Sequence, residues 1–134
     1  MRNPVKPVGL SLSVALLLCS VVPNAAAAGG PLDGKSFVGT MTARGKTKED
    51  KDTFVFKDGK FRSTMCDAYG FTEAAYTAAV SDVSIRFEAE ATSPTEGTMK
   101  WKGTVKGDSV EGTAVWTKRG QTDTVYTFKG TLTK

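Results

Sequence analysis

The chain has 134 residues, a formal net charge of +4 and no histidine. The absence of histidine removes the most common general base and zinc ligand, together with any Ser-His-Asp triad, and therefore disfavours most hydrolytic enzymes. Basic and acidic residues are interspersed without a block of one sign, so we expect no nucleic-acid partner.

The N-terminal region has the pattern of a secretory signal peptide. Arg2 and Lys6 give a short basic start, residues 8–22 are mostly apolar, and the small residues Ala25–Ala28 follow. The apolar run is short and interrupted by serine, which disfavours a transmembrane helix. We predict a signal peptide over residues 1–28 and a single β-barrel domain over residues 29–134. The expected location is periplasmic or extracellular, with no stable membrane insertion after cleavage.

The first part of the predicted domain consists of short strands joined by tight turns. Residues 44–52 are densely charged with alternating sign, and we expect them to form a solvated hairpin tip. Asp58-Gly59 is a strong signal for a type I′ hairpin turn, because that turn needs positive φ at both central positions. The strands predicted around these two turns are residues 35–42, 53–57 and 60–66.

The second part begins with a less regular segment, residues 67–75, which carries Tyr69, Gly70 and Phe71 close together. The clearest alternation follows over residues 83–92, where one face would hold Val83, Ile85, Phe87, Ala89 and Ala91. The remaining predicted strands are residues 76–80, 98–106, 109–117 and 123–133.

One five-residue pattern occurs four times: a large apolar residue, any residue, Gly, Thr and a smaller apolar residue. In each copy the glycine falls on the apolar face of the strand. Glycine inside a strand often marks a bend or a close backbone approach, which a sheet needs when it closes on itself. We therefore expect these positions to be curvature points that leave room for large interior side chains. The copies start at Phe37, Trp101, Val110 and Phe128.

Eight short strands with hairpin connections predict an all-β fold: an antiparallel up-and-down meander closed into a small barrel. The architecture resembles the small calycin barrels, lipocalin-like or streptavidin-like, although neither family's sequence signature is present. A β-sandwich is the alternative. An outer-membrane barrel is disfavoured, because several strands are shorter than the about 9–11 residues that span a bilayer. The predicted interior contains Phe37, Phe54, Phe56, Phe61, Tyr76, Phe87, Trp101, Trp116, Tyr126 and Phe128.

Aromatic side chains around the irregular segment are the first candidates for a binding site. They could form the rim of a ligand mouth at one end of the barrel, or a plug that closes the core. Together with three interior aromatic residues they make up the predicted ligand-binding set, which is Tyr69, Phe71, Tyr76, Trp101, Trp116 and Tyr126.

Cys66 is the only cysteine after the predicted cleavage site, so the domain has no internal disulfide. It is the candidate reactive thiol, for redox chemistry, metal binding or an intermolecular disulfide. A neighbouring carboxylate, Asp67, tends to raise the pKa of a thiol, which favours an unreactive cysteine packed as a small apolar residue. Met41, Met65 and Met99 could join Cys66 as soft ligands for Cu(I). Core packing explains these methionines more simply, and we predict no metal site and no cofactor.

Two polar stripes are expected to lie on the solvated exterior. Glu88 and Glu90 are about 7 Å apart on one face of a strand, but their face also carries Arg86, which disfavours a catalytic carboxylate pair. The second stripe is Lys100, Lys102, Thr104 and Lys106.

The function that we expect is that of an exported, non-catalytic barrel that binds a small, mostly apolar or aromatic ligand inside or at one end. The alternative is a structural or protein-interaction module of the cell envelope with a protein partner. A lesser alternative is a redox or metal-handling protein that depends on Cys66.

Overall fold

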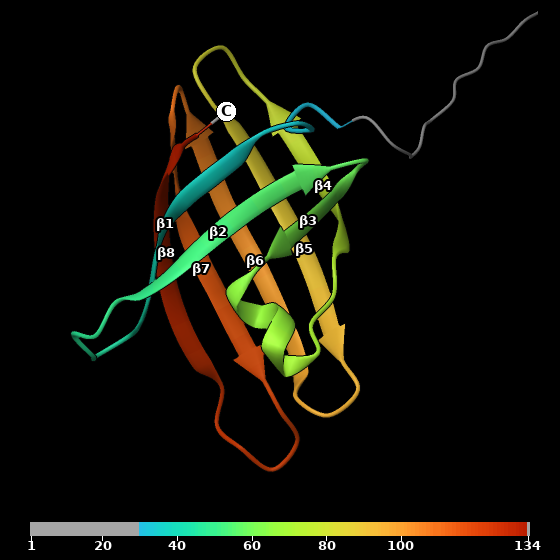
Figure 1. Ribbon diagram of the computed structural model, residues 1–134, viewed down its shortest axis with the longest axis vertical. Coiled ribbons are helices and arrows are strands. Elements are labelled where there is room, and N and C mark those ends of the chain that lie inside the picture. The colour runs from blue at the N-terminus through green and yellow to red at the C-terminus, as the bar shows by residue number, and fades with distance from the viewer. Residues whose placement is uncertain (1–29, 134) are drawn as a thin grey trace, which may run out of the picture.

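The computed structural model describes residues 30–133, and these residues form a closed antiparallel β-barrel (Figure 1). Each strand pairs with the next along the chain, and the last strand pairs with the first. The predicted up-and-down barrel is therefore confirmed, and the alternative of a β-sandwich is wrong. The predicted signal peptide, residues 1–28, lies outside the described residues. The strands are β1 (Ser36–Ala43), β2 (Asp50–Lys57), β3 (Lys60–Ser63), β4 (Ala74–Val80), β5 (Ile85–Ser93), β6 (Gly97–Lys106), β7 (Ser109–Thr117) and β8 (Thr124–Leu132).

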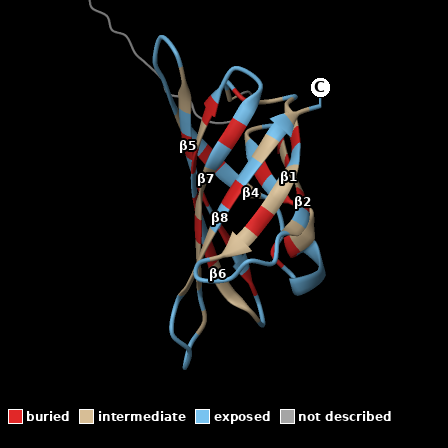
Figure 2. Ribbon diagram, turned by 90° about the vertical axis from the view of Figure 1, so that its left-hand side faces the viewer, coloured by how far each residue is buried: buried red, intermediate tan, exposed pale blue. Residues whose placement is uncertain are grey.

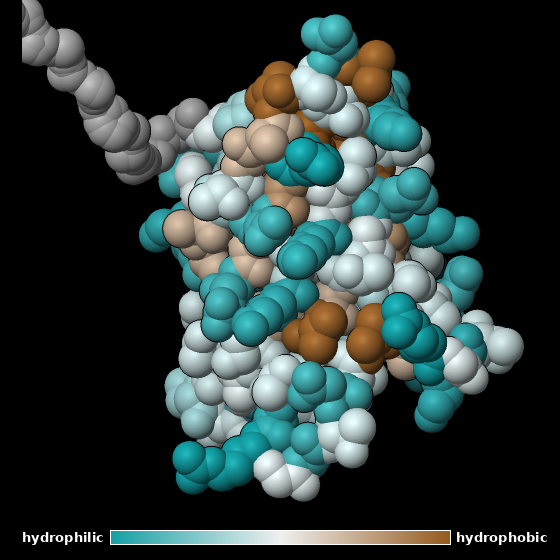
Figure 3. Space-filling view, turned by 180° about the vertical axis from the view of Figure 1, so that it is seen from behind, coloured by the Kyte–Doolittle hydropathy of each residue, from teal (hydrophilic) through white to brown (hydrophobic). Residues whose placement is uncertain are grey.

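Side chains alternate between the lumen and the solvent along each strand, as Figure 2 shows by the bands of buried and exposed residues. On β5, Phe87, Ala89 and Ala91 are buried, whereas Glu88 and Glu90 are exposed. The lysines of β6, Lys100, Lys102 and Lys106, are also exposed. Both polar stripes thus lie on the outer wall. From behind, that wall shows hydrophilic and intermediate side chains together with a few hydrophobic patches (Figure 3).

The structure differs from the sequence-based prediction after β3. This strand ends at Ser63 rather than at Cys66, and a short 3-10 helix, η1 (Met65–Tyr69), follows it. As a result, β3 pairs with β4 only through Lys60–Ala75 and Phe61–Ala74. Figure 1 shows η1 at the lower end of the barrel, beside the part of the wall where this ladder is missing.

Two further expectations need correction. The charged segment 44–52 is not all hairpin tip, because β2 begins at Asp50 and the Asp52 side chain is buried in the barrel with 4% exposure. Val83 was expected on the inner face of a strand, but β5 begins only at Ile85 and Val83 is 76% exposed. It lies in the turn between β4 and β5, where alternation no longer dictates which way a side chain faces.

The repeated glycines lie in two cross-strand pairs, Gly39–Gly130 between β1 and β8 and Gly103–Gly112 between β6 and β7. A Cβ atom on Gly39 would overlap the backbone carbonyl of Lys129, so the two strands approach too closely for any other residue. A Cβ atom on Gly103 would meet the rings of Phe87 and Phe128. The glycines therefore allow close strand approach and make room for interior rings, as expected.

Aromatic rings occupy the middle of the lumen. The Trp101 ring lies 4.8 Å from that of Phe61 and 5.3 Å from that of Phe128, and Phe56 lies 4.9 Å from Phe87, measured between ring centroids. These distances and the tilted or edge-to-face orientations are typical of stabilising aromatic pairs. The central lumen is thus packed with side chains.

The segment before β1 covers the upper end of the barrel. Leu32 is fully buried there, and its backbone N–H donates a hydrogen bond to the Tyr76 hydroxyl at 3.0 Å. Tyr76 in turn donates to Asp33 Oδ1 at 2.8 Å, and Asp33 also accepts from the backbone N–H of Gly59 at 3.0 Å. Burial and, next, the hydrogen bond to Asp33 raise the pKa of Tyr76 to about 12.

Candidate functional site: a pocket at the η1 end

The opposite end of the barrel, where η1 lies, contains a pocket with a volume of about 460 Å³. Four segments contribute to it: β1 with the β1–β2 loop and the start of β2, the η1 region, the β5–β6 loop with β6, and the facing parts of β7 and β8. We call it the η1-end pocket. Its uncharged lining residues are Met41, Met65, Cys66, Tyr69, Phe71, Met99, Trp116 and Tyr126, and its charged ones are Lys48, Asp50 and Glu96.

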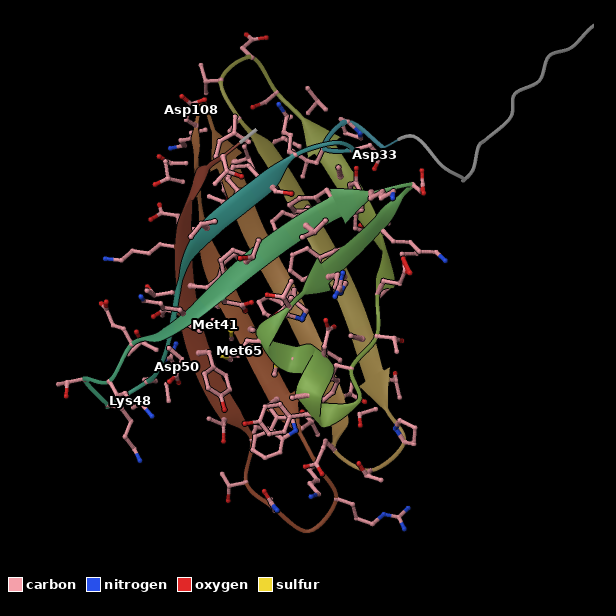
Figure 4. The ribbon with its side chains drawn as sticks, viewed as in Figure 1. Asp33, Met41, Lys48, Asp50, Met65 and Asp108 are labelled. Atoms are coloured by element: carbon pink, nitrogen blue, oxygen red, sulfur yellow. The ribbon has the colours of Figure 1, made fainter. Side chains whose placement is uncertain are left out.

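Strand register brings the lining residues together. Met99 on β6 is directly opposite Trp116 on β7, and Met41 on β1 is opposite Asp50 on β2. Tyr126 belongs to the same inward-facing set of β8 as Phe128, one alternation nearer to the open end. Figure 4 shows Met41 and Met65 at the lower part of the barrel, with Asp50 and Lys48 nearer its edge. The pocket thus begins where the ring-filled part of the lumen ends.

Asp52 holds the start of η1. Its Oδ1 accepts hydrogen bonds from the backbone N–H of Met65 at 2.9 Å and of Thr53 at 2.7 Å, and from the Thr64 hydroxyl at 3.4 Å. Its Oδ2 accepts a short hydrogen bond from the Ser63 hydroxyl. Burial raises the pKa of the Asp52 carboxyl above its usual value, and these hydrogen bonds oppose the effect. A buried carboxylate on β2 therefore fixes the backbone that presents Met65 and Cys66.

Ser93 holds the other end of η1. Its hydroxyl donates to the carbonyl of Tyr69 at 2.7 Å and accepts from the backbone N–H of Glu96 at 3.1 Å. Gly70 ends the helix with φ of 86°, a left-handed conformation that favours glycine. Ser93 is 4% exposed, so the loop between β5 and β6 and the end of η1 are joined through one buried side chain.

Cys66 faces the pocket from η1 and is 4% exposed. Burial, and to a lesser degree the charges of Asp52 and Asp67, raise the pKa of this thiol to about 11. The Asp67 carboxylate itself points to Arg62 and accepts a hydrogen bond from Arg62 Nε at 2.9 Å. At neutral pH Cys66 is a protonated thiol, which is the unreactive form.

Ion pairs and one indole hydrogen bond shape the mouth of the pocket. Lys48 pairs with Asp50 at 3.5 Å, and Lys118 pairs with Glu96 at 3.1 Å. The indole N–H of Trp116 donates to the backbone carbonyl of Glu96 at 2.6 Å. This bond satisfies the polar edge of Trp116 and leaves its apolar rings available to line the pocket. Each carboxylate at the mouth thus has a lysine partner.

The structure brings four of the six predicted ligand-binding residues to this pocket: Tyr69, Phe71, Trp116 and Tyr126. Trp101 is 2% exposed in the packed middle of the lumen, and Tyr76 lies in the upper part with its hydroxyl on Asp33. Neither lines the η1-end pocket. Cys66 and the three methionines that the sequence analysis assigned to core packing do line it.

Sequence reasoning missed the contributions of Lys48, Asp50, Asp52 and Glu96. The signal for Asp52 was present, because it stands two residues before Phe54 and therefore on the same face of the strand. The charged run around it concealed this alternation. Lys48 and Glu96 lie in loops, where no periodicity indicates the direction of a side chain.

No model of a known protein family matches the chain, and no curated protein and no solved structure matches it significantly. The likeness to calycin barrels therefore stays a prediction. The class that the coordinates define is a closed eight-stranded up-and-down barrel with a pocket at one end. Within residues 30–133, no helix is long and apolar enough to cross a membrane. The same residues contain no group of three or more His, Cys, Asp or Glu side chains placed to hold a metal ion.

Proposed function

We propose that the protein is an exported, non-catalytic β-barrel that binds a small, mostly apolar or aromatic ligand in the η1-end pocket. The observation that carries this proposal is the contrast between the two ends of one lumen. The upper end and the middle are packed with Leu32 and aromatic rings, whereas the η1 end has a pocket walled by apolar and aromatic side chains. Export rests on the signal-peptide pattern of residues 1–28.

The size and chemistry of the pocket suit a small organic ligand. Sites for such ligands have volumes of roughly 300–1,000 Å³ and apolar walls with a few polar groups, and this pocket has about 460 Å³. Tyr69, Phe71, Trp116 and Tyr126 offer ring faces, and Met41, Met65 and Met99 offer flexible thioethers that adapt to the shape of a ligand. A flat or aromatic molecule would gain stacking contacts in addition to burial.

The ionisable side chains at the pocket favour binding without catalysis. Cys66 is the one thiol at the pocket, and its pKa of about 11 keeps it protonated at neutral pH. The carboxylates Asp50 and Glu96 at the mouth are each paired with a lysine. None of these groups is poised as a nucleophile or as a general base near pH 7.

The uncharged fluorophore N-phenyl-1-naphthylamine is a suitable probe for this site. We expect saturable binding of one molecule per chain, with quenching of the fluorescence of Trp116. Replacing Tyr126 by Arg places a charge in the pocket and should abolish binding. Val38→Arg, at a 51% exposed position on the outer face of β1, is the matched control and should bind as the wild type does.

Circular dichroism of both variants checks that the barrel is intact. Tyr69 is 57% exposed, so its replacement by Ala removes one pocket ring with little risk to folding and should weaken binding. A wild-type protein that does not bind the probe, or a Tyr126→Arg variant that binds it unchanged, would overturn the proposal.

A further inference from the structure

The sulfur atoms of this protein are unevenly distributed. Between residues 30 and 133 the sulfur-bearing side chains are Met41, Met65, Cys66 and Met99, and all four line the η1-end pocket. They come from three elements that are distant in the sequence: β1, η1 and β6. The rest of the hydrophobic core is built from Phe, Trp, Tyr, Leu, Val, Ile and Ala.

Packing needs alone do not explain this segregation. Met is a filler for irregular gaps anywhere in a core, yet all three methionines of the described residues line this one pocket, with Met41 directly opposite Phe128. Met65 is only partly buried and lies at the start of η1, where its backbone N–H donates a hydrogen bond to Asp52. The sulfurs are thus collected at the end of the barrel that has free volume.

Thioethers are soft, neutral ligands that bind a metal without losing a proton. They select Cu(I) over hard cations such as Mg²⁺ or Ca²⁺, which prefer oxygen. The three flexible side chains project into one pocket from different walls, which allows their sulfurs to converge on a shared ion. The start of η1, which carries Met65 and Cys66, is held in place by the hydrogen bond from the Met65 N–H to Asp52 Oδ1 at 2.9 Å.

We propose that Met41, Met65 and Met99, with the sulfur of Cys66 as a fourth donor, form a binding site for a soft monovalent cation, Cu(I), in the η1-end pocket. This proposal goes beyond organic-ligand binding and does not depend on it. The thioethers bind as neutral ligands. If Cys66 binds as a thiolate, its proton is released to solvent.

The test uses protein recovered from cells that express the full chain. Cu(I) is titrated under anaerobic conditions in competition with bathocuproine disulfonate, and Ag(I) serves as a second soft cation that does not change its oxidation state. We expect one ion per chain in each titration and a copper–sulfur signal in X-ray absorption. A wild-type protein that binds neither cation would overturn the proposal.

The matched variant replaces Met41, Met65 and Met99 by Leu, which conserves volume and apolar character but removes the thioether sulfurs. Cu(I) and Ag(I) binding should be lost, whereas circular dichroism should show an intact barrel. The circular dichroism readout separates loss of the sulfur donors from loss of the fold. Met65→Leu alone, at the partly buried position, should weaken Ag(I) binding even if the triple variant does not fold. Unchanged Cu(I) binding by the triple variant, or by a folded Met65→Leu variant, would contradict the assignment.

Discussion

The backbone N–H of Met65 donates a 2.9 Å hydrogen bond to the buried carboxylate of Asp52, so one side chain of β2 fixes the start of η1. Together with the backbone bond from Thr64 N–H to the Thr53 carbonyl and the bond from Ser93 to Tyr69, it anchors the chain after β3 at the point where the β3–β4 ladder is missing. Since η1 presents Met65, Cys66 and Tyr69 to the pocket, Asp52 is a positioning residue for the η1 side of the site.

Asp52→Ala should be strongly destabilising. It leaves the N–H groups of Thr53 and Met65 and the hydroxyl of Ser63 without their acceptor, and each buried unsatisfied group costs about 1–3 kcal/mol. We expect a loss of about 3 kcal/mol in urea unfolding. Asp52→Asn keeps an acceptor oxygen and removes the buried charge, so its cost should be below about 1 kcal/mol. Equal stability of the two variants at pH 7 would contradict this role.

The same carboxyl should leave a signature in the pH dependence of stability. Its pKa is raised in the folded state by burial, so the folded chain retains the proton at a pH where the unfolded chain has lost it. The contribution of Asp52 to stability is therefore complete below 3.8, the ordinary pKa value, and is lost as the pH rises through the folded pKa. As the pH rises from 3, the free energy of unfolding of the wild type relative to Asp52→Asn should fall and then become constant. A stability difference that is independent of pH would contradict a raised pKa of Asp52 in the folded state.

Cys66 should behave as an inert thiol until strongly alkaline pH. Burial raises its pKa from 9.0 to about 11, so iodoacetamide should label native protein at pH 8 far more slowly than urea-unfolded protein. Between pH 9.0 and about 11 the unfolded state loses the proton first, and stability should fall by about 1.4 kcal/mol per pH unit. In Cys66→Ala this contribution should be absent, and the smaller fall caused by the raised pKa of Tyr76 should remain above pH 10. Rapid native labelling at pH 8 would show an activated thiol instead.

Closure of the barrel depends more on Gly39 than on Gly130, the glycine opposite it on β8. Gly39→Ala would place a methyl group on the Lys129 carbonyl, and we expect a loss of about 3 kcal/mol or more. In Gly130→Ala the nearest atom, the Val38 carbonyl oxygen, would be 3.2 Å from the new methyl group. We therefore expect a loss of only about 1 kcal/mol in stability. Thermal unfolding of both variants tests the difference. A Gly130→Ala variant as unstable as Gly39→Ala would mean that the seam between β1 and β8 is not packed in this way.

Alternation made most of the fold predictable. Phe87 and its neighbours on β5 repeat every second residue, and Asp58-Gly59 forms the turn that its chemistry demands, with positive φ at both residues. The closed barrel followed from hairpin connections between successive strands. In contrast, η1 escaped prediction because five residues are too few for a helical period to show, and because its capping contacts come from Asp52 and Ser93, distant in the sequence.

The pocket was predictable only in part, for a related reason. Alternation shows that Trp101 and Trp116 both face inward, but it does not show that Trp101 meets Phe61 and Phe128 while Trp116 stands where the lumen opens. That difference depends on how far each residue lies along the barrel axis and on which end the preceding segment covers. Leu32 covers the upper end, and neither its burial nor its bond to Tyr76 has a local sequence signal.

Native mass spectrometry of the protein recovered from its own cell envelope tests the central claim most directly. We expect wild-type protein to carry a small-molecule adduct that is absent from the Tyr126→Arg variant, because that variant places a charge in the η1-end pocket. Wild-type protein with the bare mass of the chain, or the same adduct on both proteins, would contradict the claim that this pocket is a binding site.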